Sequence, residues 1–73
     1  MTDIPALRPS DVIAMLRRAG YVIDRQTGSH VFLYKEGKPP AVVPRHNRDI
    51  KKGTLHNIIK GAEMTVEEFL KQR

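Results

Sequence analysis

One short stretch decides the fold of this 73-residue chain: Gly28-Ser29-His30, which leads into Val31-Phe32-Leu33-Tyr34-Lys35. Glycine accepts backbone angles that other residues avoid, and serine is common in turns, so the first three residues predict a turn. The run that follows is rich in strand-forming residues and predicts a strand, residues 30–35. Histidine has the side chain whose unperturbed pKa lies nearest neutrality. His30 is therefore either an acid–base catalyst or a structural residue at a strand entrance.

Two further extended runs flank this strand. Tyr21–Gln26 precedes the turn, and Ala41–Val43, closed by Pro44, follows a turn-forming segment, residues 36–40. Short turns between extended runs predict an antiparallel meander of three strands.

Strand alternation divides the central strand into two faces. Val31 and Leu33 share one face, and His30, Phe32 and Tyr34 share the other. We predict that Val31 and Leu33 pack against the helices because they are purely apolar, although the opposite assignment satisfies the same alternation. On an open face they would lie beside Arg25 or Gln26 of the first strand, and the two aromatic side chains could stack on nucleic-acid bases; otherwise Phe32 belongs to the core and Tyr34 is half-buried.

Helical periodicity predicts three helices around these strands. The first spans Asp11–Ala19, with Ser10 as N-cap and Gly20 as its stop, and the second starts near Gly53-Thr54. A short third helix follows Thr65, which forms a capping box with Glu68. The sequence thus predicts an α+β fold in the order α-β-β-β-α with a short C-terminal helix, its helices on one face of a three-stranded antiparallel sheet. That order is typical of a double-stranded-RNA-binding domain.

Length and composition bound the remaining possibilities. The length predicts one domain, residues 1–73, near the lower size limit for a self-sufficient core. The chain has no cysteine, which excludes disulfides, thiol nucleophiles and cysteine metal sites. It has no apolar run long enough to span a bilayer and no signal-peptide pattern, so we expect a soluble cytoplasmic protein.

Positive charge is concentrated in the middle of the chain. The formal net charge is +5, and residues 25–60 carry an excess of +6 while residues 1–24 sum to zero. Four of these cations lie in one loop before the second helix: Arg45, Arg48, Lys51 and Lys52. Next, Gly53 and Thr54 begin a helix whose free N–H groups favour phosphate. A localised basic excess indicates a polyanion partner, although it also occurs on solvated surfaces.

The sequence lacks the patterns of cofactor and metal enzymes. It contains no phosphate-binding glycine-rich loop, and its three histidines are isolated, so we predict no cofactor and no metal site. Metal-free cleavage of RNA needs only what is present. RNA supplies its own 2′-hydroxyl nucleophile, histidine suits the proton transfers, and cations and N–H groups stabilise the extra phosphate charge.

Five segments, in this order and spacing, resemble the HicA toxins of HicA–HicB toxin–antitoxin systems. They are Ala19-Gly20-Tyr21, Gly28-Ser29-His30, Val43-Pro44-Arg45-His46, the run Ile50-Lys51-Lys52-Gly53-Thr54-Leu55 leading into Ile58-Ile59-Lys60, and the ending Met64–Leu70. The resemblance covers roughly residues 9–70.

This resemblance implies a double-stranded-RNA-binding-domain-like fold and a toxin that cleaves mRNA. It also implies a cognate HicB antitoxin that covers the active site, with His30 as the catalytic histidine. Gly28 and Ser29 would support the turn, and Arg45, Arg48, Lys51, Lys52, Gly53 and Thr54 would bind RNA. His46 matches a recurrent family histidine and is either a second proton carrier or phosphate contact, or a structural residue.

Two other functions remain open. A non-catalytic RNA-binding module would share the fold and the basic face but would not depend on His30. A small interaction domain would instead use exposed Phe32 and Tyr34 to bind a protein and would show no RNA affinity at physiological salt.

Overall fold

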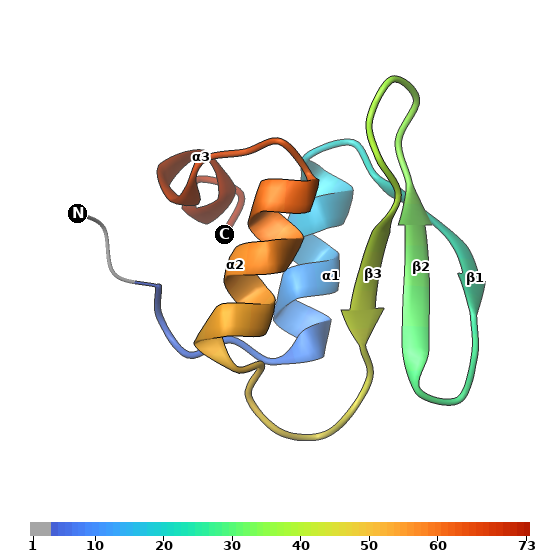
Figure 1. Ribbon diagram of the computed structural model, residues 1–73, viewed down its shortest axis with the longest axis vertical. Coiled ribbons are helices and arrows are strands. Elements are labelled where there is room, and N and C mark those ends of the chain that lie inside the picture. The colour runs from blue at the N-terminus through green and yellow to red at the C-terminus, as the bar shows by residue number, and fades with distance from the viewer. Residues whose placement is uncertain (1–3) are drawn as a thin grey trace.

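The computed structural model describes residues 4–73 (Figure 1). Its elements are, in chain order, the helix α1 (Pro9–Arg18), the strands β1 (Val22–Gln26), β2 (His30–Tyr34) and β3 (Ala41–Pro44), and the helices α2 (Lys52–Gly61) and α3 (Val66–Leu70). This order confirms the predicted α+β class and is consistent with a double-stranded-RNA-binding-domain-like fold. The predicted domain also includes residues 1–3, which lie outside the described residues.

β2 is the central strand of an antiparallel sheet with the order β1-β2-β3. The helices α1 and α2 lie on one face of this sheet (Figure 1). Val31 and Leu33 are buried, whereas Tyr34 is 49% exposed. The predicted orientation of β2 is therefore confirmed, and His30 and Phe32 share the face that is turned away from the helices.

β1 contains a bulge that the sequence analysis did not predict. Ile23 pairs with Leu33 but Arg25 pairs with Phe32, so Asp24 is an extra residue in the ladder. In a regular strand, side chains alternate between the two faces, so Arg25 would point toward the helices if β1 had no bulge. The bulge instead places Arg25 on the open side, where its guanidinium carbon lies over the Phe32 ring, 4.4 Å from the ring centre.

The start of α1 differs from the prediction. The helix begins at Pro9, with Arg8 rather than Ser10 at the N-cap, and Ser10 lies in the first turn. Proline suits the first helical position because its φ angle is fixed and the missing N–H has no partner there. The Asp11 carboxylate accepts a hydrogen bond from the Arg8 backbone N–H at 3.0 Å. The predicted stop is confirmed, since Gly20 has a φ angle of +105°.

The core fills the space between the helices and the inner face of the sheet. One face of α1, one face of α2 and the inner face of β2 supply it, together with the fully buried Phe69 of α3. Buried residues also lie outside the predicted helices and strands: Ile4 and Leu7 from the N-terminal arm, and Ile50 from the loop before α2. The Ile50 backbone N–H donates to the Leu7 carbonyl at 2.8 Å, which fixes the end of that loop.

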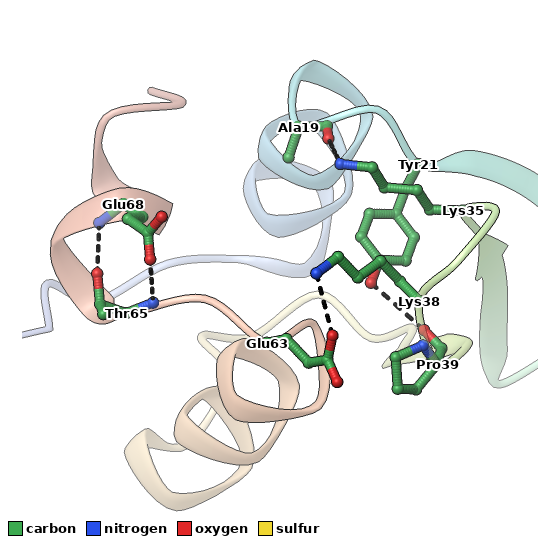
Figure 2. Close-up of polar contacts among 8 residues, drawn as sticks. All are labelled: Ala19, Tyr21, Lys35, Lys38, Pro39, Glu63, Thr65 and Glu68. Carbon is green, nitrogen blue, oxygen red and sulfur yellow. Dashed lines mark hydrogen bonds and ion pairs between the residues drawn. The ribbon is translucent and has the colours of Figure 1, made fainter.

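Polar contacts tie down the end of the sheet at which β2 finishes (Figure 2). β2 ends at Tyr34, one residue earlier than predicted, and the Lys35 ammonium donates to the Ala19 carbonyl at 2.6 Å. Tyr21, predicted as the first residue of β1, is buried before it, and its hydroxyl donates to the Pro39 carbonyl at 3.3 Å. Burial raises the pKa of this phenol above its ordinary value.

The same end carries the ion pair and the capping box. Lys38 and Glu63 form an ion pair at 3.0 Å between the β2–β3 turn and the end of α2. The Glu68 carboxylate accepts from the Thr65 backbone N–H at 2.9 Å, and the Thr65 hydroxyl accepts from the Glu68 N–H at 3.1 Å (Figure 2). These two bonds confirm the predicted capping box.

Candidate active site

The turn that carries His30 is closed by its own hydrogen bonds. The Thr27 backbone N–H donates to the His30 carbonyl at 2.8 Å, and the His30 N–H donates to the Thr27 hydroxyl at 3.1 Å. Gly28 does not use the left-handed backbone region, and a methyl group at its Cα would meet no atom within 4 Å. The turn therefore does not require glycine at this position. The space that a side chain of residue 28 would occupy is open.

His30 presents an exposed imidazole ring that is held from one side. Its Nδ1 lies 3.0 Å from the Ser29 hydroxyl, within hydrogen-bond distance. No other residue among 4–73 forms a hydrogen bond with the ring, so Nε2 is available to a ligand. Because the first residue of β2 is fixed in the sheet, this nitrogen lies on a rigid element and not on a mobile loop.

The loop after β3 is fastened to the His30 turn. The Arg45 backbone N–H donates to the Ser29 carbonyl at 2.8 Å. The Arg45 guanidinium hydrogen bonds to the Gln26 side-chain amide oxygen. The structure therefore places Arg45 beside Ser29, the residue that also contacts the His30 ring.

His46 has a defined role in the shape of this loop. Its Nδ1 accepts a hydrogen bond from the Arg48 backbone N–H at 3.2 Å. In a neutral ring this bond places the proton on Nε2, which is then a hydrogen-bond donor. His46 also borders a hollow of about 450 Å³ together with Lys51 and Thr54. The ring thus supports the loop through one nitrogen and has the other available for a ligand.

The N-terminus of α2 is predicted to bind phosphate through its free backbone N–H groups. The N-cap is Lys51, which has no side-chain cap, and the first turn contains no acidic residue. Helices α1 and α3, by contrast, have acidic residues in their first turns. A side chain at Gly53 would meet nothing within 4 Å, so a ligand can approach the N–H groups there closely.

The predicted cations are exposed and unneutralised. Arg45, Arg48, Lys51 and Lys52 are all exposed, and none of them forms an ion pair with another described residue. Hydrogen bonds join Ser29 to both His30 and Arg45, whereas the hydrogen bond of His46 goes to Arg48. His46, Lys51 and Thr54 border one hollow. Lys52 and Gly53 share the first turn of α2 with Thr54.

The sequence did not indicate that the α1 region contributes to the site. Arg8 and Arg17 of the α1 region border a second hollow, about 460 Å³, that Arg45 and His46 also line. Residues 1–24 carry no net charge, so their summed charge does not reveal where the individual arginines lie. The bulge decides between Arg25 and Gln26, the two residues predicted as neighbours of the open-face aromatics: Arg25 pairs with Phe32, and Gln26 pairs with the buried Val31.

Within residues 4–73, no three histidine or acidic side chains gather as a possible metal site. None of the helices formed by those residues is long and apolar enough to cross a membrane.

Comparison with known proteins identifies the family. No curated protein matches the chain. A family model described as the HicA toxin of bacterial toxin–antitoxin systems matches residues 9–64, which include every site residue predicted from the sequence. Because this match spans most of its length, the chain belongs to the HicA toxin family.

Proposed function

We propose that this toxin is a metal-independent endoribonuclease that cleaves mRNA, with His30 as a general acid or base. One observation carries the proposal. An exposed imidazole, held through Nδ1 by Ser29, lies beside Arg45, whose loop carries cations without ion pairs among residues 4–73 and leads to an uncapped helix N-terminus. This arrangement offers proton transfer and phosphate binding side by side.

In the proposed reaction, a base removes the proton of a ribose 2′-hydroxyl. The 2′ oxygen then bonds to phosphorus, the bond from phosphorus to the 5′ oxygen breaks, and an acid protonates that oxygen. The products are a 2′,3′-cyclic phosphate and a 5′-hydroxyl, and no further reactant is needed. DNA lacks the nucleophile and should be resistant.

The residues divide these tasks. His30 carries one proton transfer through Nε2, and His46, whose Nε2 is also available, is the candidate for the other. Arg45, Arg48, Lys51, Lys52 and the N–H groups near Gly53 and Thr54 hold the RNA phosphates. Gly28 leaves room for the substrate, since a side chain there would occupy open space beside the turn.

The family also supports a protein partner. A toxin of a toxin–antitoxin system requires a cognate inhibitor, and we propose a HicB-like antitoxin that covers His30 and the basic loop. Because mRNA is the proposed substrate, the protein would act in the cytoplasm.

The test uses purified protein and an end-labelled RNA under single-turnover conditions. His30→Ala should slow cleavage by about 10²- to 10⁴-fold, and a 2′-deoxy substitution at the cleaved position should abolish it. His56→Ala is the matched control, because His56 is exposed on α2 and outside the site, so it should cleave like the wild type. If His30→Ala also cleaves like the wild type, the mechanism is wrong. If the wild type binds RNA and never cuts it, the chain is a non-catalytic RNA-binding module.

A further inference from the structure

The face of the sheet opposite the helices carries exposed apolar side chains around the half-buried Phe32. Val22 is 58% exposed, Tyr34 49% and Val42 40%. Val22 pairs with Tyr34, and Phe32 pairs with Val42, so these side chains form a continuous strip across the three strands. We call this strip, together with Arg25 and His30, the open face. A contiguous exposed apolar patch indicates a surface that binds something.

The open face joins the proposed active site without a break. His30, Phe32 and Tyr34 are alternate residues of β2, so neighbouring members lie about 7 Å apart along the strand. The ring centres of His30 and Phe32 are 6.4 Å apart, with the rings tilted by 47°. A molecule that places a phosphate at His30 therefore has two aromatic side chains next to it along one strand.

The bulge in β1 adds positive charge to the same surface. It turns Arg25 to the open face, where the guanidinium covers Phe32. A guanidinium is flat and can itself stack on a base, and it also attracts phosphate. An apolar protein partner would gain little from this charge, whereas a nucleic acid uses both the charge and the aromatic surface.

We propose that the open face binds single-stranded RNA by stacking, with one base on the Arg25–Phe32 pair and the next on Tyr34. The inference rests on the proposed function, because it places the scissile phosphate at His30. RNA-recognition motifs use aromatic side chains on an open sheet in this way. Bases in a duplex are already stacked and paired, so the proposal requires a single-stranded substrate and a preference over duplex RNA.

Binding of a 2′-O-methyl RNA octamer, which has no free 2′-hydroxyl and stays intact, is the first test. Removing a stacking side chain typically weakens single-strand binding roughly 5- to 140-fold. Tyr34→Ala should therefore weaken binding within that range in fluorescence anisotropy, and Tyr34→Phe should retain it. The salt dependence should not change, because Tyr34 contacts no phosphate. The same RNA annealed to its complement should bind more weakly to the wild type.

A second test reports stacking itself. The chain has no tryptophan, so Tyr34→Trp introduces one fluorophore on the open face. Its emission should be quenched when the octamer binds. Lys71→Trp is the control, because Lys71 is exposed at the end of α3, on the helical side of the molecule, and its emission should stay constant.

The outcomes separate this inference from the proposed function. Unchanged affinity in Tyr34→Ala, or no quenching in Tyr34→Trp, overturns the inference whether or not RNA is cleaved. Intact RNA binding together with weakened antitoxin binding in Tyr34→Ala would make the open face a protein interface and also overturn it. If stacking is observed but His30→Ala still cleaves, the inference stands and the catalytic proposal fails. Tyr34 lies outside the core, and circular dichroism checks that each variant is folded.

Discussion

Replacing Ser29 by alanine isolates the contact that holds the His30 ring. The substitution removes the hydroxyl 3.0 Å from Nδ1. It leaves the Ser29 carbonyl, which accepts the Arg45 N–H at 2.8 Å, so the loop should stay fastened to the turn. Ser29→Ala therefore changes how the imidazole is held without moving the groups around it.

The size of the effect follows from the strength of one exposed hydrogen bond. Such a bond contributes about 0.5–1.5 kcal/mol, which corresponds to a decrease in kcat of roughly 2- to 13-fold. Loss of the general acid or base itself is expected to cost about 10²- to 10⁴-fold. Ser29 is thus predicted to be a positioning residue, and its removal should lower kcat while KM stays constant.

The assay is RNA cleavage measured over a range of substrate concentrations, with Ser29→Thr as the matched control. Threonine retains a hydroxyl at the same position and should recover most of kcat. If Ser29→Ala lowers the rate as far as His30→Ala does, the hydroxyl takes part in the chemistry itself. If kcat is unchanged, or if only KM rises, the hydroxyl does not orient the ring, and the reasoning is refuted.

Three further predictions concern charge and stability. Lys51→Gln should reduce the slope of log affinity against log salt by about 1 for RNA, because it removes one phosphate contact; an unchanged slope in a salt titration would contradict this. Phe69→Ala should lower the free energy of unfolding by about 3–5 kcal/mol, much of the total for a chain of this size, and urea denaturation measures it. Hydrogen bonds from Thr65 hold the pKa of Glu68 below its ordinary value of 4.5, so its stabilising effect is present above that value and is lost as the pH falls through the lowered pKa. Acid thermal melts should show Glu68→Gln losing this dependence, and an identical acid response in both proteins would be evidence against it.

The elements of the fold could be predicted because each has a local cause. Leu55 and Ile59 lie one helical turn apart and are buried together, and Thr65 and Glu68 satisfy one another within one turn. The face of β2 was predictable too, since Val31 and Leu33 are the apolar alternate residues. The catalytic role proposed for His30 comes from the family resemblance, because the strand pattern alone did not decide between a catalytic and a structural residue.

The remaining features depend on tertiary contacts. Asp24 becomes a bulge only because the pairing on either side of it is fixed by other strands, so nothing in its own segment identifies it. Ile50 is buried, and its backbone N–H donates to the carbonyl of Leu7 in the N-terminal arm, which lies more than forty residues away in the sequence. The predicted N-cap of α1 was wrong. Ser10 was chosen because serine is the better capping side chain, but Pro9 occupies the first helical position and makes Arg8 the N-cap.

The two ends of the sheet differ in whether their cations are paired, and this difference supports the proposed position of the site. At the end where β2 finishes, Lys35 and Lys38 are held by a carbonyl and a carboxylate of the same chain, and the buried Tyr21 hydroxyl is satisfied as well (Figure 2). Where β2 begins, the cations of the loop after β3 have no carboxylate within ion-pair distance among residues 4–73. Holding like charges together without counterions is unfavourable, and a bound phosphate chain removes that cost. One end of this small sheet therefore stabilises the fold, and the other carries the unpaired cations on which the proposed RNA binding depends.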